Sequence, residues 1–447
     1  MIERDRTAEV TDLLQHLIRN RCVNDGTPAS GQEIRNADLL RSYLEGPGVE
    51  VETYEPVPGR RSLLVRIEGS DPDAPAVCFC GHTDVVPVSP DGWSRDPFGG
   101  ELVDGEVWGR GALDMLNMTA AMAVATKELA ATGWRPRGTY LFLAVADEEA
   151  GGKHGARWLV DNEWDDVGAD YLITESGGLV LESAAGRHVT VTAGEKGVAW
   201  RRLRVRGTPG HGSMPFGTDN ALVKAAEVIR RLAAYRPKAG ISDLWRAYVQ
   251  AMDLDDDVRA GLVDPSRAWD AAASIGDPRV AKFANACTHM TFSPNVVSGG
   301  VKTNVIPDVV DIDVDIRILP GDTGDDVAAN LTEALGDLAP AVEVETVEHG
   351  AASSSPVETP MWDAIGRAVR KVYPEASLVP RLTAGGTDAR FYREKGTIAY
   401  GAALFTRSMT VADFTTRFHG HDERVDVASL GLTASLYLDL AHDVLGG

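Results

Sequence analysis

The stretch Thr139–Glu149, TYLFLAVADEE, joins an apolar run to three consecutive acids. The run has the length and residue types of a β-strand that is buried on both faces, so Asp147, Glu148 and Glu149 follow the carboxyl end of that strand. Three adjacent carboxylates repel one another unless solvent or a positive group lies between them. Both a surface turn and a cation site meet this requirement, and the neighbouring strands help to distinguish them.

Other predicted elements end or begin at side chains that can bind a metal ion. A strand predicted over 76–80 runs into His82, with Asp84 two residues later. A second buried strand precedes Glu175, and Asp114 stands where a long helix begins. Taken singly, a histidine at a strand end or an aspartate at a helix start has an ordinary structural role. In an open α/β sheet the carboxyl ends of parallel strands lie along one edge, so these side chains are predicted to converge.

Composition and charge restrict the class of protein. The chain has 447 residues, 44% hydrophobic and 25% charged, which suits a globular protein of two or three domains. Its formal net charge of -22 would repel nucleic acids and anionic membranes. No stretch is apolar enough to cross a membrane, and residues 1–7 are charged where a signal peptide needs an apolar core, so we expect a cytoplasmic protein. The chain has too few cysteines for a disulfide framework: Cys22, Cys78, Cys80 and Cys287.

The order of the predicted elements indicates two domains, one inserted into the other. Residues 1–194 alternate strands and helices, as expected for an α/β domain with a mixed, largely parallel sheet flanked by helices. Residues 195–350 follow the order strand, helix, strand, strand, helix, strand, which predicts an inserted ferredoxin-like domain. The first domain resumes over 351–447. The sequence does not predict where an excursion over 238–289 lies; helices that decorate the inserted sandwich are one interpretation.

Seven short motifs follow one another along the chain: Gly-His-Thr-Asp at 81–84, Gly-Arg-Gly-Ala-Leu-Asp-Met at 109–115, Asp-Glu-Glu at 147–149, Glu175, Gly-Thr-Pro-Gly-His-Gly-Ser at 207–213, Thr-Asn-Val-Ile-Pro at 303–307 and His-Gly-His-Asp-Glu at 419–423. Together they make nearly the whole chain resemble the cocatalytic dizinc metallopeptidases and amidohydrolases. That family includes aminoacylase, carboxypeptidase G, carnosine dipeptidase, acetylornithine deacetylase and succinyl-diaminopimelate desuccinylase. The resemblance implies a zinc-exopeptidase-like fold with an inserted lid. Leu116-Asn117 replaces the usual Lys-Gly, which changes the helix start but keeps the nearby ligand.

The resemblance implies a site for two zinc ions with five ligands: His82 and Glu175 on one ion, Glu149 and His419 on the other, and Asp114 shared. Each ion would have one imidazole, one carboxylate of its own, and a share of Asp114 and of a water molecule. This donor set suits the tetrahedral preference of zinc. Cobalt or manganese would fit the same donors. His421 is an alternative to His419.

By the same resemblance, Glu148 is the general base that takes a proton from the attacking water and passes it to the leaving amine. Asp84 supports His82, and His211 stabilises the oxyanion, often in the neighbouring subunit. Arg317 would pair with a substrate carboxylate, or alternatively with an acid of its own strand. The substrate-binding positions of the family correspond to Asn304, Arg317, Gly385, Gly386 and Thr387.

We therefore expect a dizinc hydrolase that cleaves the amide bond of a small substrate with a free carboxylate. A dipeptide or an N-acyl amino acid is such a substrate, and a homodimer formed through the lid is typical of the family. A biosynthetic deacylase of the desuccinylase or deacetylornithine type is an alternative within the hydrolases. A noncatalytic binding protein on the same fold is an alternative from another class, but Glu148 and all five ligand positions favour an enzyme.

Overall fold

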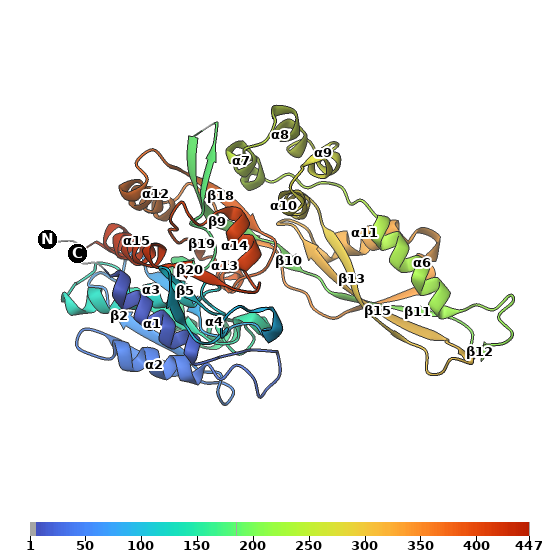
Figure 1. Cartoon of the computed structure of the whole chain (residues 1–447), viewed down its shortest axis with the longest axis horizontal. Helices are drawn as coiled ribbons and strands as arrows, with labels where there is room; N and C mark the ends of the chain where they lie inside the picture. The colour runs from blue at the N-terminus through green and yellow to red at the C-terminus, as the bar shows by residue number, and fades with distance from the viewer. Residues whose placement is uncertain (1–5, 185, 447) are drawn as a thin grey trace.

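The computed structural model describes residues 6–184 and 186–446. Most of the charged opening stretch therefore lies outside the described residues. A larger and a smaller lobe lie side by side along the long axis of the molecule (Figure 1). In the larger lobe the first helix, α1 (Thr7–Arg19), packs against the last, α15 (Val427–Leu445). Within the described ranges, no helix is both long enough and apolar enough to span a bilayer.

The larger lobe contains a ten-stranded mixed sheet. β6 (Tyr140–Val145) is fully buried, with β2 (Ser62–Ile67) antiparallel on one side and β3 (Val77–His82) parallel on the other. β3 also pairs in parallel with β7 (Tyr171–Thr174), which pairs in parallel with β19 (Ile398–Gly401). The predicted α/β class, with a largely parallel sheet around a buried strand, is confirmed.

Helices cover both faces of this sheet. Phe79 and Phe142 belong to the apolar cluster that includes α3 (Leu116–Ala131) and α15. Cys78 and Cys80 point to the other face and pack with α13 (Ala389–Glu394), so both are buried core residues with free thiols, as predicted. The other helices of the lobe are α2 (Ile34–Leu44), α4 (Ala156–Asn162), α5 (Trp164–Val167), α12 (Pro360–Val372) and α14 (Val411–Arg417).

The sequence analysis did not predict the strands that lie beyond β19 in the sheet. β9 (Gly186–Glu195) pairs antiparallel with β8 (Val180–Ser183) and parallel with β18 (Ser377–Thr383). Polar residues interrupt the apolar run of β9, and Pro380 lies within β18, so neither sequence resembles a central strand. The remaining short strands of the lobe are β1 (Glu50–Tyr54), β4 (Glu101–Val103), β5 (Glu106–Trp108), β17 (Ser353–Ser354) and β20 (Arg424–Asp426).

The smaller lobe is a ferredoxin-like sandwich, as predicted. Its antiparallel strands lie in the spatial order β13 (Thr291–Gly299), β15 (Val309–Ile318), β11 (Arg201–Arg206), β16 (Val342–Thr346). The helices α6 (Ala221–Ala234) and α11 (Gly324–Leu335) contact each other and bury apolar residues against this sheet. The short strands β12 (Gly210–His211) and β14 (Val305–Ile306) pair at its far end (Figure 1). The short strand β10 (Gly197–Val198) pairs antiparallel with β15.

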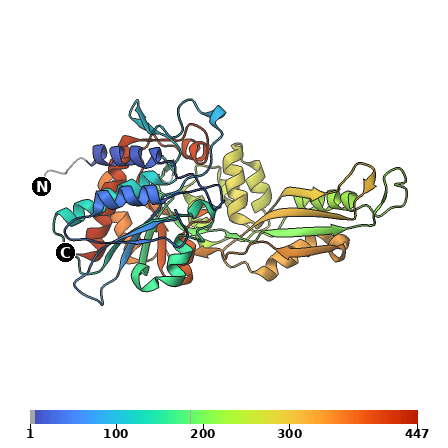
Figure 2. The ribbon, with the colours of Figure 1, turned by 90° about the horizontal axis from the view of Figure 1, so that it is seen from below.

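The excursion forms four helices: α7 (Asp243–Ala251), α8 (Asp256–Leu262), α9 (Ala268–Ser274) and α10 (Pro278–Thr288). Their apolar side chains cluster with Val379 and Leu382 of β18. The helices lie where the two lobes meet (Figure 2). The excursion is helical, as expected, but it packs against the edge of the large sheet instead of decorating the sandwich.

Candidate metal centre

The three acids at the end of β6 lie at the edge of the sheet where the other predicted ligands also lie. Asp147 has a left-handed backbone with φ of 69° and begins the turn Glu148–Ala150. β3 and β7 run parallel to β6 and to each other, so His82 and Glu175 lie at that same edge. Asp114 stands just before α3, which packs against β3. The parallel sheet therefore brings together residues that are far apart in the sequence.

Ligand atoms lie within 4.8 Å of one another in two groups of three residues: His82, Asp114 and Glu175 in one group, and Asp114, Glu149 and His419 in the other. The Nε2 atom of His82 lies 3.1 Å from Oδ1 of Asp114. The Nε2 atom of His419 lies 2.8 Å from Oδ2 of Asp114. One carboxylate oxygen of Asp114 thus lies near His82 and the other near His419, which is the arrangement expected of a ligand shared by two ions. His421 is exposed and lies outside both groups.

Burial dominates the electrostatics of this ligand cluster. Burial and neighbouring acids raise the pKa of Glu148 and of Glu175 well above the usual range, and they raise the pKa of Glu149 to about 7. Burial also opposes ionisation of Asp114, but hydrogen bonds with His419 and His82 lower its pKa. Four acids thus lie close together with the buried imidazole of His82, while the imidazole of His419, 44% exposed, lies at the solvent side of the cluster. Divalent cations would offset the remaining negative charge.

An unsatisfied buried atom supports the fit of a metal ion. Among the residues that the structure describes, the Oε1 atom of Glu149 has no hydrogen-bond partner, and its Oε2 atom lies 3.4 Å from Nε2 of His419. Leaving a buried carboxylate oxygen unpaired is costly. A cation held by Glu149, Asp114 and His419 would satisfy this oxygen. The mixture of imidazole and carboxylate donors suits zinc, and also cobalt or manganese.

Asp84 connects the histidine at the end of β3 to the turn that follows β6. The Nδ1 atom of His82 lies 3.0 Å from the backbone oxygen of Asp84 and 3.6 Å from its carboxylate. The same carboxylate accepts hydrogen bonds from the backbone N–H groups of Glu148 at 3.3 Å and Glu149 at 3.1 Å. Asp84 therefore fixes the ring of His82 and the backbone that carries two further site residues.

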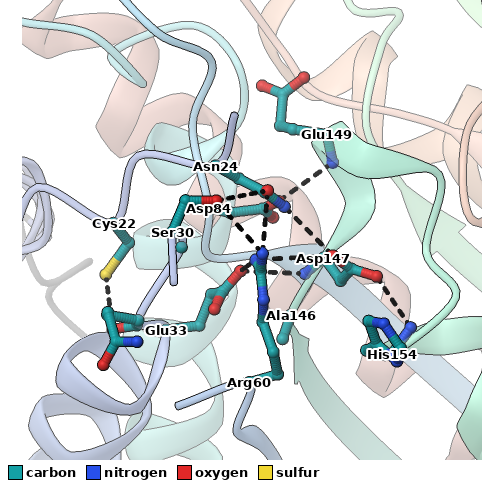
Figure 3. A network of polar contacts seen from close by, with 12 residues as sticks. Cys22, Asn24, Ser30, Glu33, Arg60, Asp84, Ala146, Asp147, Glu149 and His154 are labelled. Carbon is teal, nitrogen blue, oxygen red and sulfur yellow. Dashed lines mark hydrogen bonds and ion pairs between the residues drawn. The ribbon is translucent and has the colours of Figure 1, made fainter. Parts of the chain in front are cut away.

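A second layer of polar residues lies behind Asp84 (Figure 3). Asn24 donates hydrogen bonds to Asp84 at 2.8 Å and to Asp147 at 3.2 Å. Arg60, with 3% of its side chain exposed, pairs with Glu33 at 2.6 Å and lies 3.5 Å from Asp147. The sequence analysis missed Asn24, Glu33 and Arg60, because no local pattern connects them with the motifs that they support.

Glu423 is a further residue whose role sequence reasoning missed. Its Oε1 atom accepts hydrogen bonds from the backbone N–H groups of Gly111, Leu113 and Asp114 at 3.1, 2.7 and 3.1 Å. Its Oε2 atom accepts a hydrogen bond from Arg110 at 2.5 Å. Glu423 thus holds the loop that presents Asp114. Its position in the motif at 419–423 was the available signal.

The turn after β18 connects to the point where the chain leaves the large sheet. Glu195, the last residue of β9, accepts a hydrogen bond from the backbone N–H of Thr387 and pairs with Arg393 at 2.6 Å. Asp388, which follows Thr387, is buried, and burial raises its pKa to about 7. Neither of its carboxylate oxygens has a hydrogen-bond partner in the described part of the chain. Sequence reasoning singled out Gly385, Gly386 and Thr387 here and missed Asp388.

The predicted lid residues do not join the ligand cluster within one chain. His211 is exposed in β12, at the far end of the smaller lobe (Figure 1). Asn304 lies beside it, where its backbone oxygen accepts a hydrogen bond from Gly212 at 2.8 Å. Arg317 donates to Asp315 at 2.8 Å. The sequence allowed Arg317 to pair either with a substrate carboxylate or with an acid of its own strand. In the structure it pairs with an acid of its own strand.

Comparison with known proteins identifies relatives along most of the chain. The model of peptidase family M20/M25/M40 matches residues 78–443. Human N-fatty-acyl-amino acid synthase/hydrolase PM20D1 is 27% identical over 398 residues, which cover 86% of this chain and 76% of that protein. Aminoacylase-1 of Sus scrofa is 26% identical over 398 residues, which cover 88% of this chain and 86% of that protein.

Solved structures share the fold over nearly the full length. The M20 metallo-carboxypeptidase Sso-CP2 of Sulfolobus solfataricus has a TM-score of 0.74 at 17% identity, covering 98% of this chain and 99% of that one. YxeP of Bacillus subtilis, described as a dinuclear metal-binding peptidase, has a TM-score of 0.61 at 15% identity, covering 98% and 99%. The resemblance stated from the motifs is confirmed. Because the family model spans residues 78–443, this chain belongs to peptidase family M20/M25/M40 and is a hydrolytic enzyme.

Proposed function

We propose that this enzyme is a two-metal hydrolase that cleaves the amide bond of an N-acyl amino acid or a dipeptide. The observation that carries this proposal is the position of Asp114, whose two oxygens face two separate groups of ligand atoms. The names of the human and pig relatives, an N-fatty-acyl-amino acid hydrolase and an aminoacylase, favour the N-acyl amino acid. A location in the cytoplasm stays a prediction.

In this proposal each of the two groups of ligand atoms would hold one metal ion. His82 and Glu175 would hold one ion, Glu149 and His419 would hold the other, and Asp114 would be shared by both. Zinc is the expected metal because the donors are imidazoles and carboxylates. When bound, two such ions polarise the scissile carbonyl and lower the pKa of a water molecule at the site.

Glu148 is the proposed general base. It lies beside Glu149 in the turn after β6 and belongs to neither group of ligands. Besides burial, the charges of His82 and Asp114 affect the pKa of Glu148, which supports a position close to the ligands. Its carboxylate takes a proton from the attacking water and passes that proton to the nitrogen of the leaving amine.

His211 is proposed to act in a homodimer. Within one chain it lies at the far end of the smaller lobe, where large apolar side chains are also exposed. Met214, Phe216 and Val301 of this lobe are 68%, 101% and 90% exposed. Exposed apolar groups of this kind are typical of protein interfaces. In the proposed dimer His211 and Asn304 approach the ligand cluster of the other subunit, where His211 stabilises the oxyanion. Arg317 and the turn Gly385-Gly386-Thr387 stay predicted substrate contacts.

A mixed pool of dipeptides and N-acyl amino acids tests the substrate class. We expect the purified protein to consume some members of the pool, a chelator to stop the reaction, and added zinc to restore it. Mass spectrometry of substrates and products provides the measurement. Turnover that is insensitive to the chelator would contradict the metal dependence. No turnover after zinc addition would contradict the proposed substrates and favour a biosynthetic deacylase with a narrow substrate.

The Glu148→Gln variant tests the general base. Glutamine keeps the shape of the side chain but cannot accept the proton, so we expect kcat to fall by about 10²- to 10⁴-fold. Metal content should stay unchanged, because Glu148 lies outside both ligand groups. Glu375→Gln, at an exposed position, is the matched control and should retain full activity. A kcat within twofold of wild type for Glu148→Gln would remove this role.

Mixing two inactive variants tests the role of His211 between subunits. Glu148→Gln lacks the base and His211→Ala lacks the oxyanion contact, but their heterodimer contains one complete site. Random mixing makes half of all dimers heterodimers, and each heterodimer has one complete site. About a quarter of all sites in the mixture are then functional, so the expected activity is about a quarter of that of wild type. We expect activity to return to that level after the subunits exchange. Two folded, inactive variants that exchange subunits without regaining activity would show that His211 does not act across subunits.

A further inference from the structure

A large pocket lies against the helical excursion, and its lining residues are distinct from the candidate metal ligands. Its volume is about 900 Å³, near the upper end of the range for small-molecule sites, about 300–1,000 Å³. The walls come from the excursion helices, from β8 with the segment before it, and from α14 with the loop before it. Many of the lining side chains are apolar, among them Leu179, Leu181, Met252, Leu254, Phe283 and Val411.

The register of the sheet relates this pocket to the ligands. Thr174, which precedes Glu175, pairs with Gly401, and Gly401 pairs with Thr192. Thr192 pairs in turn with Arg381, which lines the pocket. These residues form one row across four neighbouring strands. Three strand spacings of roughly 4.8 Å put the backbone of Arg381 about 14 Å from that of Thr174.

Two chain segments run directly from the pocket wall to the ligands. Leu179 lines the pocket four residues after Glu175, and Thr415 lines it four residues before His419. A substrate whose amide lies at the cluster can therefore extend along these segments into the pocket. The pocket provides room beyond the amide for a long substituent.

The charges of the pocket wall favour an uncharged occupant. Two of the lining arginines pair with acids: Arg279 with Asp277 at 2.7 Å, and Arg407 with Glu182 at 2.9 Å. The third, Arg381, lies over the ring of Phe283 at 5.1 Å. The cations are thus engaged within the wall, while apolar side chains line most of the remaining surface. Burying a hydrocarbon chain against such a surface is favourable.

We infer that this pocket binds the acyl chain of the substrate and that the enzyme acts on medium- to long-chain N-acyl amino acids. The inference rests on the proposed function and specifies its substrate class. The acyl carbonyl lies at the ligand cluster, and the chain extends between the segments of Leu179 and Thr415 toward α10. The excursion therefore supplies one wall of the acyl site, a role that its sequence did not indicate.

Binding to the Glu148→Gln variant tests the inference without turnover. Isothermal titration calorimetry with one amino acid acylated by chains from acetyl to dodecanoyl, each below its micellar concentration, gives the dissociation constants. We expect the dissociation constant to fall by about fourfold for each CH₂ group buried, which corresponds to about 0.8 kcal/mol, until the pocket is full. A dissociation constant that does not depend on chain length would overturn the inference.

Tryptophan substitutions in the wall locate the binding site. Val280 is half-buried on α10 and lines the pocket, so Val280→Trp should fill space that the chain needs. Displacing two CH₂ groups would weaken dodecanoyl binding by about 15-fold and leave acetyl binding unchanged. Ile275→Trp, at a second lining position, provides the same test if Val280→Trp does not fold. Val223→Trp, at a position on α6 that is 68% exposed, is the matched control.

Turnover separates the inference from the proposed function. If wild type hydrolyses N-acetyl amino acids but neither wall variant weakens dodecanoyl binding, the acyl pocket is wrong and the hydrolase assignment stands. If binding depends on chain length and on Val280 but no acylated amino acid is hydrolysed, the pocket stands and the proposed reaction is wrong.

Discussion

Four carboxylates, those of Asp114, Glu148, Glu149 and Glu175, lie together with the buried imidazole of His82 and the partly exposed imidazole of His419 at one edge of the large sheet. Removing each charge from water costs several kcal/mol, and the repulsion among the acids adds to that cost. The two imidazoles alone do not balance four acids. Two divalent cations between them would convert this repulsion into attraction, which is why the structure around the cluster is best understood as a support for metal ions.

That support consists largely of hydrogen bonds to the backbone. Glu423 holds the loop before Asp114, and Asp84 holds the turn of Glu148 and Glu149. Asn24 and the buried pair of Arg60 with Glu33 hold Asp84 and Asp147 from behind, while the Glu149 carboxylate points away from this network (Figure 3). Ligands fixed in this way lose little freedom when a metal binds, and their geometry is set before the substrate arrives.

Sequence patterns predicted the parts of the molecule that depend on local order. The apolar run of β6 predicted a buried strand, and the alternation of elements predicted both the parallel core and the ferredoxin-like lobe. The grouping of ligands came from the order of the motifs. Long-range packing leaves no such local pattern in the sequence. Pro380 and Arg381 make β18 unlike a typical strand, and the packing of the excursion against β18 depends on contacts between residues far apart in the chain. Asn24 and Arg60 were missed for the same reason.

The metal content of three proteins tests the central claim most directly. After loading with zinc and dialysis, wild type should contain about two metal ions per chain, because its donors form two groups. Asp114→Ala should lose both ions, since Asp114 belongs to both groups, whereas His419→Ala should lose only one. Circular dichroism confirms that each variant is folded, and plasma mass spectrometry measures the metal. A folded Asp114→Ala protein that retains two ions, or a wild type that binds none, would contradict the two-metal centre.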